Sequence, residues 1–166
     1  MSPLSSKTLD RMSSEDLNML MVCARQLTNQ ARAGERRANL RGKNLALLSS
    51  SPDTDEAKAF REAVVQLGAR LATVQISLSE SSTAEEVERT ARLLGRFYDA
   101  IECQGMAPAV VCKIRFFAGV PVFDALASSR HSTAALWSLL GCDASPAECR
   151  RSVIQAAVMA ALAQGL

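Results

Sequence analysis

Histidine is nearly absent from this sequence, and cysteine occurs without the spacing of a metal or disulfide site. The only histidine in 166 residues is His131, so the ligand spacing of a zinc site is missing. The five cysteines form no C-x-x-C motif and no disulfide framework. We therefore expect no metal, no cofactor and a reducing compartment.

Long hydrophobic runs and a strong charge imbalance are also missing. The longest apolar run, 153–163, is interrupted by Gln155 and is too short to span a bilayer. The N-terminus lacks the basic-then-apolar pattern of a signal peptide. The net charge is only +2, and the one basic cluster, 32–43, contains Glu35 and no aromatic residue. These absences argue against membrane and nucleic-acid partners and predict a cytoplasmic protein.

What the sequence does contain is a regular alternation of apolar strands and capped helices. A length of 166 residues fits a single domain. The alternation predicts an α/β fold with three layers, α/β/α, around a parallel four-stranded sheet. The expected strands cover 45–48, 71–76, 99–103 and 120–123. The expected helices cover 13–27, 53–67, 83–95, 108–118, 131–140 and 145–164.

The loops after the first, third and fourth strands should carry any site. Ligands of parallel α/β sheets sit beyond the carboxyl ends of the strands. The first of these loops runs into a helix at 52–54, and a helix start offers free N–H groups and a positive dipole end to a phosphate. The loop nevertheless carries Asp53, Asp55 and Glu56. Their negative charges repel an anion and instead complement the positive end of the helix dipole.

The stretch 43–69 resembles the phosphate loop of the aspartate and ornithine carbamoyltransferases. In that family the turn reads Pro-Ser-Thr-Arg-Thr-Arg, and here positions 52–57 read Pro-Asp-Thr-Asp-Glu-Ala. The resemblance places Asp55 at the arginine that grips phosphate, keeps Thr54, and puts Asp53 in place of the serine. The framework is kept while the basic residues are replaced by acids.

Two further loops carry the same resemblance. Residues 99–101 match the family's Asp-Ala-Ile, and Gln104 stands where the family has an arginine that touches the carbamoyl group and phosphate. The stretch 119–141 resembles the family's Gly-Val-Pro-Val run, and His131 matches the histidine that polarises the carbamoyl carbonyl. The site implied by the resemblance therefore consists of Ser51, Asp53, Thr54, Asp55, Gln104 and His131.

The end of the chain resembles the last helix of a complete carbamoyltransferase. The family pattern acid-x-Ala-Glu-Asn-Arg is matched at Ala147, Glu148 and Arg150. The resemblance implies one unit over 1–166, with a framework over 1–142 and a terminal helix over 143–166 that packs back on it. The family's second domain is missing between them, and the implied strand order is 2-1-3-4.

The resemblance implies a catalytically degenerate carbamoyltransferase-like domain that acts as a binding, regulatory or oligomeric assembly module. The family trimerises through this domain, so we expect a trimer or a mixed assembly with an active carbamoyltransferase. One alternative is residual carbamoyl-phosphate binding or transfer, with the acceptor site supplied by another chain. There His131 and Thr54 would act, with His131 as the natural general acid or electrophile, and Lys58 or Arg130 could replace the lost arginines. A second alternative is a sensor of a different small ligand, neutral or cationic.

Overall fold

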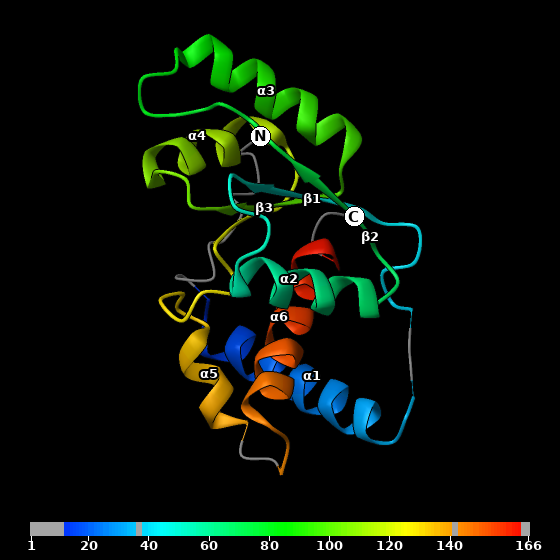
Figure 1. The fold of residues 1–166 in the computed structure, drawn as a ribbon. Helices are drawn as coiled ribbons and strands as arrows, with labels where there is room; N and C mark the ends of the chain where they lie inside the picture. Colours follow the sequence, from blue (N-terminus) through cyan, green and yellow to red (C-terminus); the bar gives the residue numbers. More distant parts are fainter. Residues whose placement is uncertain (1–11, 36–37, 141–142, 164–166) are drawn as a thin grey trace.

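The computed structural model describes residues 12–35, 38–140 and 143–163 of the chain. Strands and helices alternate in these residues up to the fourth strand, after which two helices follow (Figure 1). Their order is α1 (Ser14–Arg32), β1 (Asn44–Ser49), α2 (Asp55–Gln66), β2 (Arg70–Val74), α3 (Ala84–Phe97), β3 (Ala100–Gln104), α4 (Pro108–Ala118), β4 (Val122–Asp124), α5 (Ala134–Leu139) and α6 (Pro146–Ala163).

The four strands form one parallel sheet in the order β2-β1-β3-β4. This confirms the predicted fold class and strand order. The strand boundaries differ by a few residues from the predicted ones, most clearly in β4, which begins at Val122 rather than at residue 120. Pro121 has no N–H to donate to the ladder. Only its carbonyl joins the sheet edge, by accepting from Ile101 N at 2.9 Å.

Helices cover both faces of the sheet. α3 and α4 pack against each other on one face, and α2 packs with α6 on the other (Figure 1). α1 and α5 lie against α6, so they add an outer tier to the predicted three layers. The starts of α1 and α3 are closed by capping boxes, in which Ser13 pairs with Asp16 and Thr83 with Glu86, as the sequence predicts.

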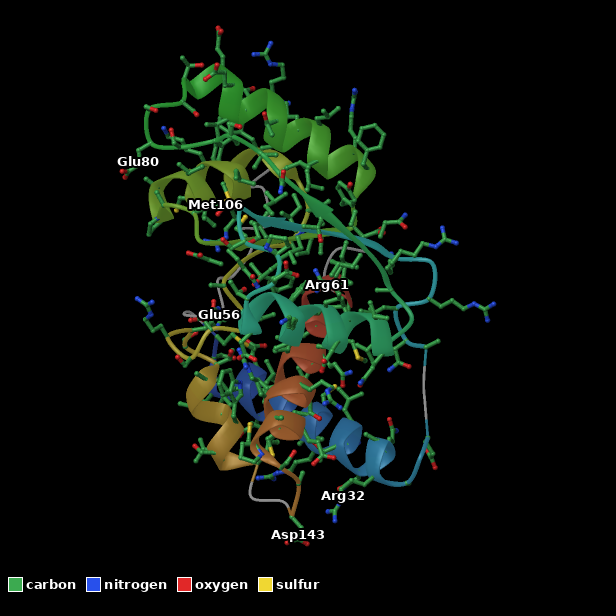
Figure 2. The ribbon with its side chains drawn as sticks, in the orientation of Figure 1. Arg32, Glu56, Arg61, Glu80, Met106 and Asp143 are labelled. Atoms are coloured by element: carbon green, nitrogen blue, oxygen red, sulfur yellow. The ribbon has the colours of Figure 1, made fainter. Side chains whose placement is uncertain are left out.

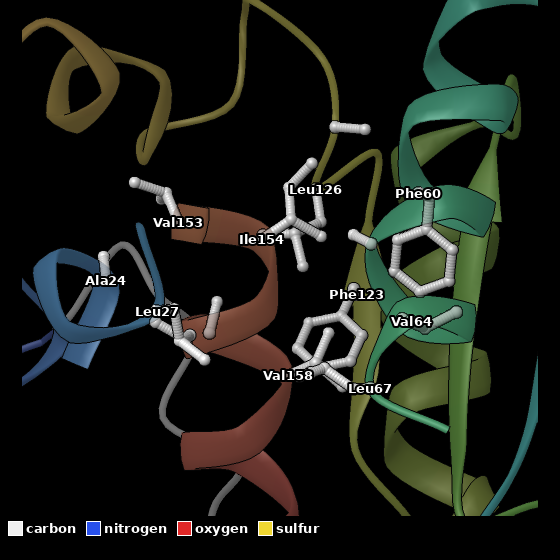
Figure 3. Close-up of a cluster of buried hydrophobic side chains, with 14 of the residues drawn as sticks. Ala24, Leu27, Phe60, Val64, Leu67, Phe123, Leu126, Val153, Ile154 and Val158 are labelled. Carbon is white, nitrogen blue, oxygen red and sulfur yellow. The ribbon is translucent and has the colours of Figure 1, made fainter. Parts of the chain in front are cut away.

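The core on the α2 side of the sheet is built around α6 (Figure 3). Residues 152–158 of this helix are buried without interruption, because α1, α2 and α5 surround it. Val153 and Ala157 are buried as expected, whereas Ala160 and Ala161 are only half-buried. The buried Gln155 is satisfied, since its Nε2 donates to the carbonyl of Ala63 in α2 at 3.0 Å.

On the other face, α3 and α4 approach closely at Gly95. A Cβ atom added there would lie 1.8 Å from the carbonyl oxygen of Ala118, so only glycine permits this crossing. None of the helices within the described residues is long and apolar enough to cross a membrane.

Candidate functional site

The carboxyl ends of β1, β3 and β4 lie side by side and bring three loops together. Ser49 at the end of β1 is in register with Gln104 at the end of β3, and Cys103 is in register with Asp124 of β4. The segments after these strands therefore meet at one edge of the sheet, as the parallel topology requires. The candidate site is built from these segments and from one side chain of α6.

The loop after β1 leads directly into the first turn of α2. Ser51 N donates to Ser49 Oγ at 3.1 Å, which tightens the turn. Thr54 is the N-cap, and its Oγ1 accepts from Ala57 N at 3.1 Å. The first helical turn carries Asp55 and Glu56, and Figure 2 labels Glu56 at this end of α2. The side chains of Ser51, Asp53 and Thr54 are exposed, so this segment faces outward.

Asp55 forms an ion pair with Arg150 of α6. Asp55 Oδ2 lies 2.8 Å from Arg150 Nη1. The hydrogen bond and charge of Arg150 lower the pKa of the Asp55 carboxyl. The Asp55 side chain is 88% exposed and that of Arg150 only 17%, so the arginine is fixed by the protein and the aspartate reaches it from solvent.

Two groups besides Asp55 hold the Arg150 guanidinium in place. Nε donates to the carbonyl of Ala127 at 3.0 Å, and Nη2 donates to the same oxygen. The guanidinium also lies over the ring of Trp137, 5.1 Å from its centroid, which is a cation–π contact. Sequence reasoning matched Arg150 to a family motif but did not place it in the site. The possible substitutes named there, Lys58 and Arg130, are exposed.

The end of β3 holds a buried polar pair. Gln104 is 4% exposed, and its Nε2 donates to Glu102 Oε1 at 3.1 Å. Glu102 is fully buried, and its Oε1 also accepts from Leu126 N at 3.0 Å. Burial raises the pKa of Glu102 to about 8, and the charges of Asp124 and Glu56 add to the rise. Sequence reasoning missed Glu102, although a charged residue inside an apolar strand is itself a signal.

The loop after β4 is held in an unusual backbone conformation. Ala125 has φ 51°, a left-handed backbone conformation that residues other than glycine seldom adopt. Its N–H donates to the carbonyl of Cys103 at 2.8 Å, and the next N–H, of Leu126, reaches Glu102. Burial raises the pKa of the Cys103 thiol, and Glu102 adds to this, so Cys103 stays protonated and is unsuited to nucleophilic attack.

His131 lies in the turn before α5 and not in the helix. The predicted helix over 131–140 is wrong at its start, because α5 begins at Ala134. His131 Nδ1 accepts from Thr133 N at 3.2 Å and lies 2.9 Å from Thr133 Oγ1. These hydrogen bonds within residues 131–133 form in place of the first helical turn that the sequence predicts. Half-buried His131 thus lies in the segment that follows β4, and these hydrogen bonds are local to that segment.

The structure brings the predicted residues at the ends of β1 and β3 to one edge of the sheet but gives them different partners. Ser51, Asp53, Thr54 and Asp55 share the loop and helix start, whereas the amide of Gln104 turns to Glu102. Within the described residues, no three His, Cys, Asp or Glu side chains are placed to hold a metal ion.

Comparison with known proteins assigns this architecture. A sequence profile described as "Aspartate/ornithine carbamoyltransferase, carbamoyl-P binding domain" matches residues 6–142. The chain belongs to the aspartate/ornithine carbamoyltransferase family. An ornithine carbamoyltransferase of Actinobacillus pleuropneumoniae serotype 5b is 35% identical over 125 residues, which are 75% of this chain and 37% of that protein.

Solved carbamoyltransferases share the fold. The ornithine carbamoyltransferase from Pyrococcus furiosus matches with a TM-score of 0.69 at 23% identity over 84% of this chain and 46% of that one. The catalytic subunit of M. jannaschii aspartate transcarbamoylase matches with a TM-score of 0.64 at 21% identity over 80% and 44%. The chain thus spans less than half the length of these carbamoyltransferases.

Proposed function

We propose that this chain is a carbamoyltransferase-family domain that does not hold carbamoyl phosphate and that works as a binding, regulatory or assembly module. The observation that carries the proposal is the Asp55–Arg150 ion pair. An anionic ligand at the start of α2 would need free N–H groups together with positive charge. Asp55 instead places negative charge at that helix start and occupies the guanidinium beside it.

One observation favours a second function, which is residual binding or transfer of carbamoyl phosphate. Arg150 brings a cation to the site and is held there independently of Asp55, by the carbonyl of Ala127 and the ring of Trp137. Asp55 is largely exposed, so water can replace it as the partner of Arg150. In this alternative a ligand phosphate displaces Asp55, and another chain supplies the acceptor site.

Isothermal titration with carbamoyl phosphate separates the two functions. Our proposal expects a dissociation constant weaker than about 100 μM, which corresponds to roughly −5.5 kcal/mol. Asp55→Ser should bind at least about tenfold tighter than the original chain, because Arg150 then loses its ion-pair partner and the helix start carries one negative charge fewer. Asp53→Ser is the matched control, since it removes an exposed neighbouring acid for which no ion pair is seen with any described residue.

A constant below about 100 μM for the unmodified chain would refute the proposal and favour the second function. If Asp55→Ser and Asp53→Ser bind carbamoyl phosphate with equal affinity, the Asp55–Arg150 ion pair is not what prevents its binding.

We further infer that the domain acts within an oligomer in the cytoplasm. Family members include the catalytic subunit of an aspartate transcarbamoylase, and this chain exposes Leu93, Phe97 and Phe116 on the α3–α4 side. Phe116 is 78% exposed, which is unusual for a side chain that gains stability by burial. Light scattering after size exclusion should give the mass of a trimer, or of a mixed assembly when a transcarbamoylase of the same cell is added. A monomer at tens of micromolar in both experiments would contradict this inference.

A further inference from the structure

Glu102 is a buried acid that has no basic partner among the described residues. It lies in the middle strand pair of the sheet and has 0% exposure. The charged groups that face it are Asp124 on β4 and Glu56 on α2, and both are acidic. Its hydrogen-bond donors within the described residues are the amide of Gln104 and the backbone N–H of Leu126. An ionised carboxylate at such a place is costly, because burial removes it from bulk solvent and the charges that face it are also negative.

The hydrogen bonds of the pair leave two acceptors without a donor. Glu102 Oε1 accepts twice, while Glu102 Oε2 and Gln104 Oε1 are both buried and have no hydrogen-bond partner in the part of the chain that the structure describes. If Glu102 were ionised, both oxygens would lack a bond, and each unsatisfied buried acceptor costs free energy. A single proton on Oε2 removes both deficits, since a carboxylic acid O–H can donate to an amide carbonyl.

We propose that Glu102 is kept as the neutral carboxylic acid and that its Oε2–H donates to Gln104 Oε1, closing a two-bond acid–amide pair beneath the loop after β4. This pair is independent of the function proposed above. The pKa of Glu102, raised to about 8 mainly by burial, agrees with it.

The acid–amide pair positions the loop that holds Arg150. Glu102 Oε1 fixes Leu126 N, and the next residue, Ala127, provides the carbonyl that accepts from Arg150. Glu102 is thus a positioning residue for Arg150, acting through two adjacent loop residues. When the acid ionises, negative charge appears beside Asp124 and Glu56, and the pair loses the bond between Oε2 and Gln104. The loop and its hold on Arg150 should therefore loosen at alkaline pH.

Carbon NMR of protein labelled at the glutamate side-chain carboxyl tests the proposal directly. The Glu102 signal is the one that disappears in Glu102→Gln, and Glu85→Gln identifies an ordinary exposed glutamate. At about pH 6.5, where a free glutamate is ionised, the Glu102 signal should have the shift of a neutral acid, and it should titrate near pH 8. A carboxylate shift at pH 6.5 overturns the proposal, including the case in which a water molecule or a small cation fills the gap.

Gln104→Arg gives a second test that does not require Glu102 to be replaced. A guanidinium beside Glu102 favours the ionised form, so the titration midpoint should fall by at least about 2 pH units. Gln104→Met removes the amide but adds no charge, and there the midpoint of Glu102 should stay above that of a free glutamate. If the midpoint of Glu102 equals that of a free glutamate in the unmodified chain and in both variants, the proposal fails.

Discussion

Replacing Ile154 by alanine tests whether α6 belongs to the folding core. Ile154 is fully buried and lies beside Leu126 within the cluster that contains Phe60 and Phe123 (Figure 3). Removal of such a side chain costs about 2–5 kcal/mol, because contacts are lost and a cavity remains. α6 is surrounded by three helices, so its neighbours have little freedom to close the gap. We therefore expect about 3–4 kcal/mol, a large part of a domain stability of roughly 5–15 kcal/mol.

Thermal and urea unfolding measure this cost. For a protein of this size the expected loss lowers Tm by about 6–16 °C. Leu139→Ala in α5 is the control, because that side chain is 60% exposed and its loss should change the free energy of unfolding by less than about 1 kcal/mol. Equal urea midpoints for the two variants would show that α6 is an appendage and would refute the argument from burial.

Three further predictions concern the site and the other face of the sheet. The free energy of unfolding should fall by up to about 5 kcal/mol as pH rises from about 4.5 to about 8, because over this range folded Glu102 keeps a proton that the unfolded chain releases. In Glu102→Gln, urea unfolding should no longer show this dependence on pH. Arg150→Ala should lower the free energy of unfolding by about 2–4 kcal/mol, since the Ala127 carbonyl loses its donor and the Trp137 ring loses its cation–π partner. The control Arg151→Ala breaks only a 3.9 Å ion pair with Glu62 and should lower it by less than about 1 kcal/mol. Gly95→Ala should destabilise the protein by at least about 3 kcal/mol in the same assay, and a Tm equal to that of the original chain would contradict the close helix crossing.

The acidic side of the pH profile has the opposite sign. Arg150 lowers the pKa of Asp55, and the backbone N–H of Ser145 lowers that of Glu148. A carboxyl with a lowered pKa stabilises the fold above its unfolded pKa, and this contribution is lost as the carboxyl protonates. Both carboxyl groups are exposed, so solvent screens their contributions to stability. Above about pH 5 the fall in stability with rising pH that comes from Glu102 therefore dominates.

The elements of the fold were predictable because their signals are local. Apolar runs bounded by capping residues place β1, α2 and α3 within a few residues of their observed ends. The errors occur where side chains or sheet edges override the pattern. Because of Pro121, β4 begins two residues later than predicted. Because of the hydrogen bonds between His131 and Thr133, α5 begins three residues later than predicted. The strand order came from the family resemblance, since the pairing of parallel strands is not encoded in any local run.

The partners within the site were not predictable, because they depend on contacts between distant segments. Asp55 and Arg150 are 95 residues apart, and only the packing of α6 beside α2 brings them together. Glu102 and Leu126 meet through the register of β3 and β4. The family resemblance implies that Asp55 and Gln104 stand at arginine positions, but the sequence could not show what these two residues contact.

Both replacements at the site are compensated within the chain, and this gives the site a consistent electrostatic logic. Asp55 adds an acid at the start of α2, and Arg150 pairs with it. Gln104 supplies an amide where a guanidinium would have neutralised Glu102. The pair leaves two buried oxygens unsatisfied within the described residues, Glu102 Oε2 and Gln104 Oε1, and one proton between them would satisfy both. A phosphate ligand would have to compete with Asp55 for Arg150 and would meet no cation at position 104. The two changes therefore act in the same direction, against an anion, while each leaves the local charge balanced.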